Sequence, residues 1–317
     1  MKLFEHPDFR DVLVATAEQS GIPEQFVEKD YYVTEALRIV AAAYSQQVVF
    51  KGGTSLSKGW GLIERFSEDI DLFLNPQAFV PALSKRGIDR EMKRFRDLIG
   101  AHPGLTLLPD ESRTVKSLGR EDYFGYASVF GPPRTIRPAL KVEPGVQSGD
   151  HPLARVELTS YAGRFVRDHG LPDIADDAGP FTMTLLHYRR TFVEKLFTIH
   201  GKVERLLLEG IAVGRDARHY ADLHALGRRA DVREMLRTRE YAEIRHDYDQ
   251  KSRQFFPKSY RSPDGLGFSH SQALFPPDDL GRRLRRDYES QCRILFYGPY
   301  PTFDEVLAGF EELREWL

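Results

Sequence analysis

The chain has 317 residues, which is enough for one large domain or two ordinary ones. Hydrophobic residues make up 41% of it and aromatic residues 12%, values typical of a globular protein with apolar cores. Charged residues almost cancel to a formal net charge of -2, so bulk charge neither indicates nor excludes a nucleic-acid partner.

The cysteine count and the hydropathy pattern lead us to expect a cytoplasmic protein. A single cysteine, Cys292, excludes an internal disulfide framework and a four-cysteine zinc site. The N-terminal stretch MKLFEHPDFRDVLV has acids and a proline where a signal peptide needs an apolar run. No stretch approaches the roughly 18 uninterrupted apolar residues of a membrane span, so we expect no contact with a membrane.

The first half of the chain predicts an α+β fold. Two helices fill residues 8–43; the first ends at Gly21 and the second has Pro23 in its first turn. An amphipathic pattern predicts a further helix at residues 85–102. β-Branched and aromatic runs predict strands at residues 46–50, 69–74 and 154–161, and a hairpin of residues 122–130 and 137–146 across the sequence GPPRTI.

The composition changes at residues 168–180, which are rich in Pro, Gly and Asp and are typical of a linker. Beyond this stretch, strand patterns mostly vanish and apolar residues recur at helical spacing. Helices are expected at residues 188–208, 217–229, 280–296 and 303–317. We therefore predict two domains, residues 1–175 and 176–317, of which the second is mostly helical.

Two aspartates stand one residue apart in the predicted strand DIDLFL. Residues i and i+2 of a strand point to the same side, so Asp69 and Asp71 project together while Ile70 faces the core. Adjacent carboxylates repel each other unless a cation lies between them. Oxygen ligands suit Mg²⁺ (or Mn²⁺), which usually binds one or two carboxylates together with substrate phosphates. The spacing therefore predicts a divalent-metal site.

A glycine-rich loop precedes these acids. Gly52 and Gly53 permit close approaches that a Cβ would block. Thr54 or Ser55 is expected to cap a helix whose free N–H groups favour an anion, and Lys51 adds a positive charge. Taken singly, the glycines read as a turn and the aspartates as solvated acids of a strand edge. Their order along the chain favours a joint site that holds a metal and a triphosphate.

A third carboxylate, Glu143, is expected on a later strand, with Lys141 on the same face. Glu143 either completes the metal site and helps to deprotonate an attacking hydroxyl, or lies beside an ion pair made by Lys141. The residues themselves leave both interpretations open.

These motifs resemble those of the AbiEii/AbiGii toxin family of nucleotidyltransferases, a branch of the DNA polymerase β-like superfamily. The similar stretches are KGGTSLSK and RFSEDIDL within residues 51–72, VEKDYYVTEAL (27–37), KVE (141–143), TFVEKLFTIH (191–200) and RHYADL (218–223). The resemblance implies a polymerase β-like domain with a mixed sheet, followed by a mostly helical domain. It also implies a toxin of a toxin–antitoxin or phage-defence system, with NTP as substrate, a cognate antitoxin as partner and an RNA acceptor, in some relatives the 3′ end of tRNA.

Site residues follow from the resemblance by motif position. It implies phosphate contacts from Gly52, Gly53, Thr54 and Ser55, a reaction centre at Ser67 and Asp69, a second metal ligand in Asp71, and Lys195 and Asp222 as residues of the helical domain that face the cleft. Two features depart from the superfamily pattern. The interval between Gly53 and Asp69 is longer than usual, although it suits this branch, and the third acid is Glu143 rather than an aspartate.

The helical motifs have physical interpretations of their own. One polar face at helical spacing contains Thr191, Lys195, Thr198 and Lys202. Lys195 is placed either to neutralise charge on a triphosphate or to pair with Glu194 in solvent. Arg65 either contacts phosphate or fixes Glu68.

Other charged residues also keep two interpretations. Arg218 and Asp222 form either a plain helix ion pair or part of the site, with Asp216 as a lower-ranked candidate. The basic run GRRLRRDY (281–288) either binds an RNA backbone or is a solvated helix face.

We therefore predict a metal-dependent transfer of NMP from NTP to an RNA hydroxyl, with release of pyrophosphate. Two alternatives differ in class. One is an NTP-dependent phosphotransferase that modifies a protein hydroxyl, or Ser67 itself. The other is a non-catalytic module that binds RNA or a protein partner.

Overall fold

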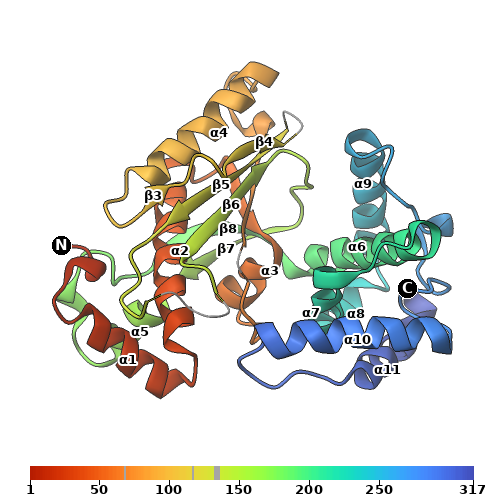
Figure 1. The fold of residues 1–317 in the computed structure, drawn as a ribbon. Coiled ribbons are helices and arrows are strands. Elements are labelled where there is room, and N and C mark those ends of the chain that lie inside the picture. Colours follow the sequence, from red (N-terminus) through yellow and green to blue (C-terminus); the bar gives the residue numbers. More distant parts are fainter. Residues whose placement is uncertain (68, 116–117, 132–135) are drawn as a thin grey trace. The chain divides into compact units, whose positions relative to one another are not determined.

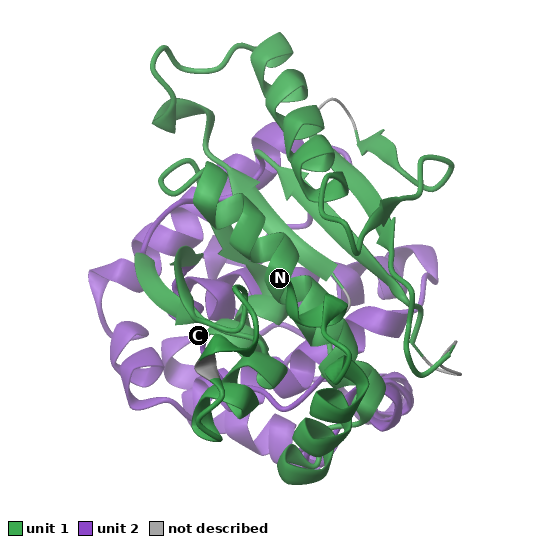
Figure 2. Cartoon of the chain, turned by 90° about the vertical axis from the view of Figure 1, so that its left-hand side faces the viewer, with its two compact units in different colours: residues 1–59, 66–146, 153–185 green, residues 60–65, 147–152, 186–317 purple. Residues whose placement is uncertain are grey.

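The computed structural model describes residues 1–67, 69–115, 118–131 and 136–317. The described chain divides into two compact units, which Figure 2 distinguishes by colour. Unit 1 consists of residues 1–59, 66–146 and 153–185, and unit 2 consists of residues 60–65, 147–152 and 186–317. The predicted boundary lies between residues 175 and 176, whereas the last change from unit 1 to unit 2 falls between Leu185 and Leu186.

Unit 1 is built on a mixed sheet (Figure 1), which confirms the predicted α+β class. Its strands are β1 (Val48–Lys51), β2 (Asp69–Leu74), β3 (Thr106–Leu107), β4 (Arg113–Val115), β5 (Gly119–Gly125), β6 (Ala139–Gly145), β7 (Leu153–Leu158) and β8 (Phe181–Leu186). The strand order is β3-β5-β6-β2-β1-β8-β7, and β4 pairs with β5. The antiparallel pairing of β5 with β6 confirms the predicted hairpin, whose loop lies partly outside the described residues.

Buried and half-buried side chains alternate along β2 and β6, so the sheet has one buried face and one more open face. Ile70 in β2 and Val142 in β6 are buried, and successive side chains of a strand point to opposite faces. β2 and β6 run parallel, and their register places Asp71 opposite Glu143. Asp69, Asp71 and Glu143 are all half-buried and therefore share the more open face.

Helices cover the buried face of this sheet. The helices of unit 1 are α1 (Phe9–Ser20), α2 (Glu24–Ala43), α3 (Gly52–Thr54), α4 (Lys85–Gly100) and α5 (Tyr161–Asp168), and a π-helix (Ser55–Gly59) follows α3. α2 packs against β6 and α4 against β5, and both helices contact each other (Figure 1). The predicted strand at 154–161 ends at Leu158, because Ser160 caps α5 by accepting a hydrogen bond from the Gly163 N–H at 2.8 Å.

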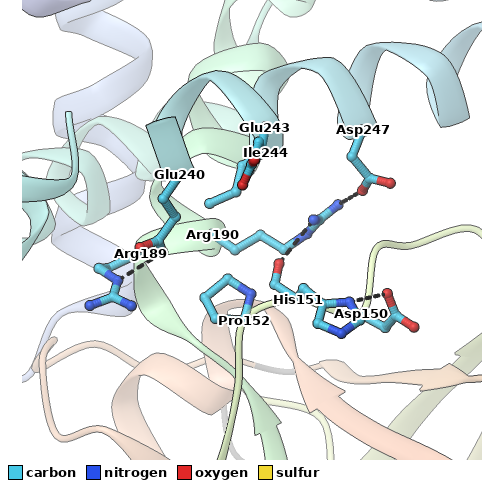
Figure 3. A pocket seen from close by; sticks show the side chains of 9 residues that line it. All are labelled: Asp150, His151, Pro152, Arg189, Arg190, Glu240, Glu243, Ile244 and Asp247. Atoms are coloured by element: carbon cyan, nitrogen blue, oxygen red, sulfur yellow. Dashed lines mark hydrogen bonds and ion pairs between the residues drawn. The ribbon is translucent and has the colours of Figure 1, made fainter. Parts of the chain in front are cut away.

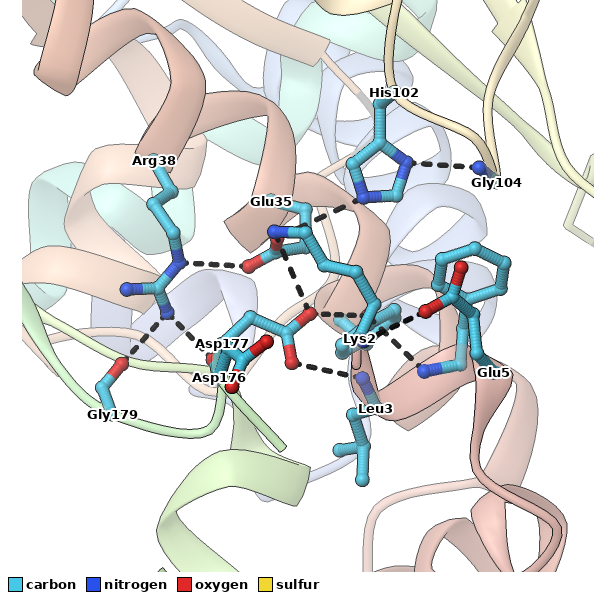
Figure 4. Close-up of polar contacts among 12 residues, drawn as sticks. Lys2, Leu3, Glu5, Glu35, Arg38, His102, Gly104, Asp176, Asp177 and Gly179 are labelled. Carbon is cyan, nitrogen blue, oxygen red and sulfur yellow. Dashed lines mark hydrogen bonds and ion pairs between the residues drawn. The ribbon is translucent and has the colours of Figure 1, made fainter. Parts of the chain in front are cut away.

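A polar cluster joins the N-terminal segment of unit 1 to α2 (Figure 4). The buried carboxylate of Glu35 in α2 lies 2.7 Å from the ammonium of Lys2 and 2.8 Å from Nε of Arg38. Asp177 accepts hydrogen bonds from the Tyr31 hydroxyl at 2.6 Å and from a backbone N–H of the N-terminal segment. These contacts satisfy charges that would otherwise be costly to bury.

Unit 2 is mostly helical, as predicted for the second half of the chain. Its helices are α6 (Tyr188–Glu209), α7 (His219–Gly227), α8 (Ala230–Met235), α9 (Arg239–Phe255), α10 (Asp278–Leu295) and α11 (Phe303–Leu313). α6 packs against α7, α8 and α9 and buries apolar side chains such as Phe192, Leu196 and Ile199. Among the helices of the described residues, none has both the length and the apolar character needed to cross a membrane.

Candidate functional site

The glycine-rich loop contacts the acidic strand within unit 1. Gly52 has a φ of +78°, and a Cβ added to it would lie 2.0 Å from Oδ2 of Asp71. Only glycine fits such a position, because other residues would both strain the backbone and collide with the carboxylate. Lys51 stands opposite Asp71 in the antiparallel register of β1 and β2. The structure therefore brings together the two halves of the predicted motif.

Thr54 and Ser55 play a different part from the predicted helix cap. The helix begins at Gly52, so both hydroxyl residues lie after its first residue. The Thr54 hydroxyl donates to the backbone carbonyl of Asp69 at 2.5 Å, and the Ser55 hydroxyl donates to the carbonyl of Gly52 at 2.9 Å. The cap prediction is wrong because the chain turns at the left-handed Gly52 and the N-cap position falls at Lys51, three or four residues earlier than expected. These side chains tie the loop to β2 and to itself.

The three carboxylates lie on neighbouring strands and interact electrostatically. Burial raises the pKa of Glu143, and the negative charges of Asp71 and Asp69 raise it further, against the effect of Lys141. The Lys141 ammonium lies 2.7 Å from Oε1 of Glu143, so the expected ion pair of Lys141 is made with Glu143 itself.

The donor set of this face suits a hard divalent cation. A cation between the carboxylates would remove the repulsion that raises the pKa of Glu143. Within the described part of the chain, however, no three His, Cys, Asp or Glu side chains converge as a ready-made metal centre. Asp69 and Asp71 fit the usual pattern of two protein carboxylates completed by substrate oxygens.

A second charged constellation lies inside unit 2. Asp222 of α7 is fully buried, and its two oxygens accept from Nε and Nη2 of Arg65 at 2.7 and 2.8 Å. Oδ2 of Asp222 also lies 2.8 Å from the ammonium of Lys195 in α6. The Lys195 ammonium is 2.9 Å from Nδ1 of His219. Lys195 and Asp222, which the resemblance implied as residues that face the cleft, thus pair with each other in the interior of unit 2, with Arg65 as a third member.

Burial and neighbouring charges shift the pKa values of Asp222 and His219 in this constellation. Burial alone would raise the pKa of Asp222, but Arg65 and Lys195 outweigh it and hold the pKa well below the usual range. The pKa of His219 is lowered to about 4, first by burial and then by the charge of Lys195. At neutral pH Asp222 is therefore ionised beside Arg65 and a neutral His219, while burial lowers the pKa of Lys195 against the charge of Asp222.

The predicted polar face of α6 is not a solvated face. Thr191 and Lys195 are buried, and the Thr198 hydroxyl donates to the backbone carbonyl of Glu194 at 2.8 Å. Lys202 lies 2.5 Å from Asp216, the lower-ranked candidate. The alternative pairing of Lys195 with Glu194 is also wrong, because Lys195 lies against Asp222 and the Glu194 carboxylate accepts from Arg190 at 2.9 Å.

Other predicted residues are less well defined by their contacts. Ser67 is half-buried in unit 1. The suggested contact of Arg65 with Glu68 lies outside the described residues.

The predicted basic run lies in α10. Arg285 donates to Asp304 at 2.9 Å, while the exposed arginines of the run are Arg282, Arg283 and Arg286. This arrangement fits a solvated helix face, and a role in RNA binding stays a prediction.

Unit 2 also contains a pocket that none of the sequence motifs predicted (Figure 3). Its volume is about 320 Å³, and none of the predicted site residues lines it. Arg189 donates to Glu240 at 3.0 Å, and Arg190 donates to Asp247 at 2.5 Å. Both arginines are therefore already paired with acids of the pocket lining, which also includes Asp150 and Glu243.

Comparisons with known proteins agree with the geometry. A family model described as "Nucleotidyl transferase AbiEii toxin, Type IV TA system" matches residues 35–309, which is most of the chain. A search of curated proteins finds no match. The matched range contains the glycine loop, the Asp69–Asp71 strand and the Lys195–Asp222 pair. The chain therefore belongs to the AbiEii nucleotidyl transferase toxin family of type IV toxin–antitoxin systems.

Proposed function

We propose that unit 1 binds an NTP and that the protein transfers its NMP group to a hydroxyl of an RNA acceptor. The observation that carries the proposal is the contact of Gly52 with the Asp71 carboxylate. In this contact, a glycine that has no side chain lies directly beside the carboxylate of Asp71. A phosphate chain on the loop would then lie within reach of Asp69 and Asp71, as metal-dependent phosphoryl chemistry requires.

The residues of this face have distinct proposed roles. Asp69 and Asp71 would hold Mg²⁺ or Mn²⁺, with Glu143 as a third ligand or as the base that accepts the proton of the attacking hydroxyl. The bound metal would supply charge stabilisation at the transferred phosphate. Lys51 and the residues 52–55 would hold the phosphates, and Ser67 lies on the segment that leads into Asp69.

Lys195 remains the proposed phosphate ligand of unit 2. Asp222 accepts two hydrogen bonds from Arg65 as well as the contact from Lys195. Asp222 would therefore stay paired if the Lys195 ammonium turned to a phosphate oxygen. This arrangement lowers the cost of moving a buried cation from one partner to another, since neither carboxylate nor ammonium is left alone. Arg65 itself is buried in the ion pair, so its predicted phosphate contact is the weaker proposal.

The acceptor that we propose is RNA, with the 3′ end of tRNA as the first candidate. Membership of the family supports a toxin that acts by nucleotidyl transfer and is paired with an antitoxin. A protein hydroxyl is the alternative acceptor, with transfer of the γ-phosphate in place of NMP. The two reactions differ in which phosphorus is transferred to the acceptor: the α-phosphorus with release of pyrophosphate, or the γ-phosphorus with release of NDP. Position-specific labels therefore separate them.

The decisive experiment incubates the protein and Mg²⁺ with total RNA and each NTP, labelled at either the α- or the γ-phosphate. We expect α-label in RNA from one or more NTPs. Asp69→Asn should reduce the transfer by at least about a hundredfold, the usual cost of losing one charge-stabilising group. Asp97→Asn removes an exposed acid of the same unit and should leave the transfer unchanged.

Two results would contradict the proposal. Incorporation of γ-label into protein without α-label in RNA would favour the phosphotransferase. Growth inhibition that persists in cells producing the Asp69→Asn variant would show that toxicity does not depend on this chemistry and would favour a binding module.

A further inference from the structure

Three consecutive charged residues lie in the interior of α2. Glu28 and Lys29 are buried, and the Asp30 side chain is nearly so. Charged side chains are rarely buried without partners, because desolvation is costly. Glu28 accepts from the Ser128 hydroxyl at 2.6 Å, and Lys29 donates to a backbone carbonyl at 3.2 Å. Each of the three therefore binds a separate segment of unit 1.

Asp30 binds the segment that continues the glycine loop. Its Oδ1 lies 2.6 Å from the ammonium of Lys58, which also donates to the carbonyl of Thr159 at 3.1 Å. Oδ2 of Asp30 accepts from the backbone N–H of Tyr161 at 2.9 Å, at the first residue of α5. The Lys58 side chain is only 5% exposed. One ion pair thus joins α2, the start of α5 and the π-helix.

The loop depends on such tertiary anchors. α3 has three residues, and the π-helix that follows it has five. Neither segment has the length of a self-supporting helix, and π-helical turns are rare and frequently occur at functional sites. The hydroxyl of Thr54 fixes the first part of the segment to β2, and Lys58 fixes its last turn to Asp30.

We propose that Asp30 and Lys58 are positioning residues that hold the loop 52–55 in the conformation that binds the triphosphate. The inference rests on the function proposed above. A buried ion pair adds little net stability compared with apolar residues of similar size, whereas it fixes direction and distance. Loss of the pair should therefore weaken NTP binding more than it weakens the fold.

The test compares two double variants that each remove a buried ion pair without leaving a lone charge. Asp30→Asn with Lys58→Met removes the positioning pair. Arg120→Met with Asp122→Asn is the matched control, since this pair has side chains 7% and 2% exposed and bonds of 2.7 and 2.9 Å in the same unit. Asp122 stands opposite Val142 in the β5–β6 register, so the control pair lies on the face away from Glu143.

Two measurements are made on both full-length variants. Hydrogen exchange of amides 52–59 reports on the loop alone, and we expect faster exchange in the Asp30/Lys58 variant than in the control. The Kd for NTP should rise by about ten- to a hundredfold in that variant, as expected for a misplaced binding group, while the control keeps its affinity. A rise in KM with little change in kcat would accompany it.

The outcomes separate the inference from the function on which it rests. Exchange at 52–59 that is equal in the two variants, or faster exchange with unchanged NTP affinity, would overturn the positioning role. If the unmodified protein binds no NTP, the proposed function fails, while hydrogen exchange still decides whether the pair holds the loop. Should the double variant not fold, Asp30→Glu keeps the charge but shifts the carboxylate by one methylene, and the same two measurements apply.

Discussion

Gly52 and Gly170 have nearly the same backbone conformation in different surroundings. Their φ angles are +78° and +75°, but a Cβ on Gly52 would meet Asp71, whereas a Cβ on Gly170 would meet nothing within 4 Å. Both glycines belong to unit 1. Alanine variants of the two glycines therefore separate the free-energy cost of a left-handed backbone from the cost of a collision with the Asp71 side chain.

We expect Gly170→Ala to destabilise the protein by about 1–2 kcal/mol, the cost of a left-handed conformation for a residue with a Cβ. Gly52→Ala should cost more than Gly170→Ala and should also abolish NTP binding, because Asp71 must move to admit the methyl group. Urea unfolding and NTP titration of the two variants measure these effects. Equal losses of stability with retained NTP binding would show that the close contact is unimportant.

The residues around Asp222 show what the sequence can and cannot predict at this scale. Helical spacing suggested Arg218 as its partner, but Arg65, which is 157 positions away, makes a bidentate pair with it. No local pattern signals a partner at that separation. By contrast, the alternation in β2 correctly placed Asp69 and Asp71 together, because strand periodicity is a local property.

At the scale of elements, the start of α6 depends on the protonation of one histidine. Nδ1 of His187 accepts a hydrogen bond from the Arg189 N–H at 3.2 Å and so caps the helix. Burial, and then the charge of Arg189, lower the pKa of His187 to about 4 from an ordinary value of 6.5. The unfolded chain therefore binds this proton more readily, and stability is lost as pH falls from 6.5 towards 4.

We expect His187→Asn to keep the cap and to remove this pH dependence. Between about pH 7 and pH 5, the unmodified protein should lose about 1 kcal/mol more than the variant, after allowance for solvent screening of a half-exposed ring. His187→Ala is the control, since it also removes the titration but should cost about 1 kcal/mol at neutral pH through loss of the cap. Urea unfolding at both pH values measures the differences, and parallel curves for all three proteins would contradict the prediction.

Elements were predictable where their apolar pattern is strong. The apolar periodicity of α6 and the apolar and aromatic residues of β2 were sufficient, whereas α9 was missed because its inner face is partly polar. Asp249 of α9 is buried and accepts from the hydroxyls of Tyr260 and Ser262 at 2.8 Å, so it does not follow an apolar stripe. β8 was also missed, since its place beside β1 depends on a parallel pairing with a strand far back in the chain.

At the scale of the whole molecule, the chain crosses between the two units several times, whereas two domains joined by one linker need a single crossing. Unit 2 includes residues 60–65 and 147–152 in addition to 186–317. The first of these segments supplies Arg65 to Asp222, and the second supplies the His151 carbonyl, which accepts from Arg190 at 3.0 Å. The helical unit is therefore incomplete if the chain is cut at the predicted linker.

We expect a fragment of residues 186–317 to lack a cooperative fold, although it contains every helix of unit 2. Without Arg65, the buried Asp222 loses its bidentate partner, and breaking such a pair costs about 3–5 kcal/mol. That cost is comparable with the total stability of many domains, about 5–15 kcal/mol. Thermal unfolding followed by circular dichroism, with the full chain and full-length Arg65→Met as references, measures the effect. The cooperativity of unfolding of full-length Arg65→Met should lie between that of the fragment and that of the full chain, because this variant retains residues 147–152. A fragment that melts as cooperatively as the full chain would show that the two inserted segments are dispensable.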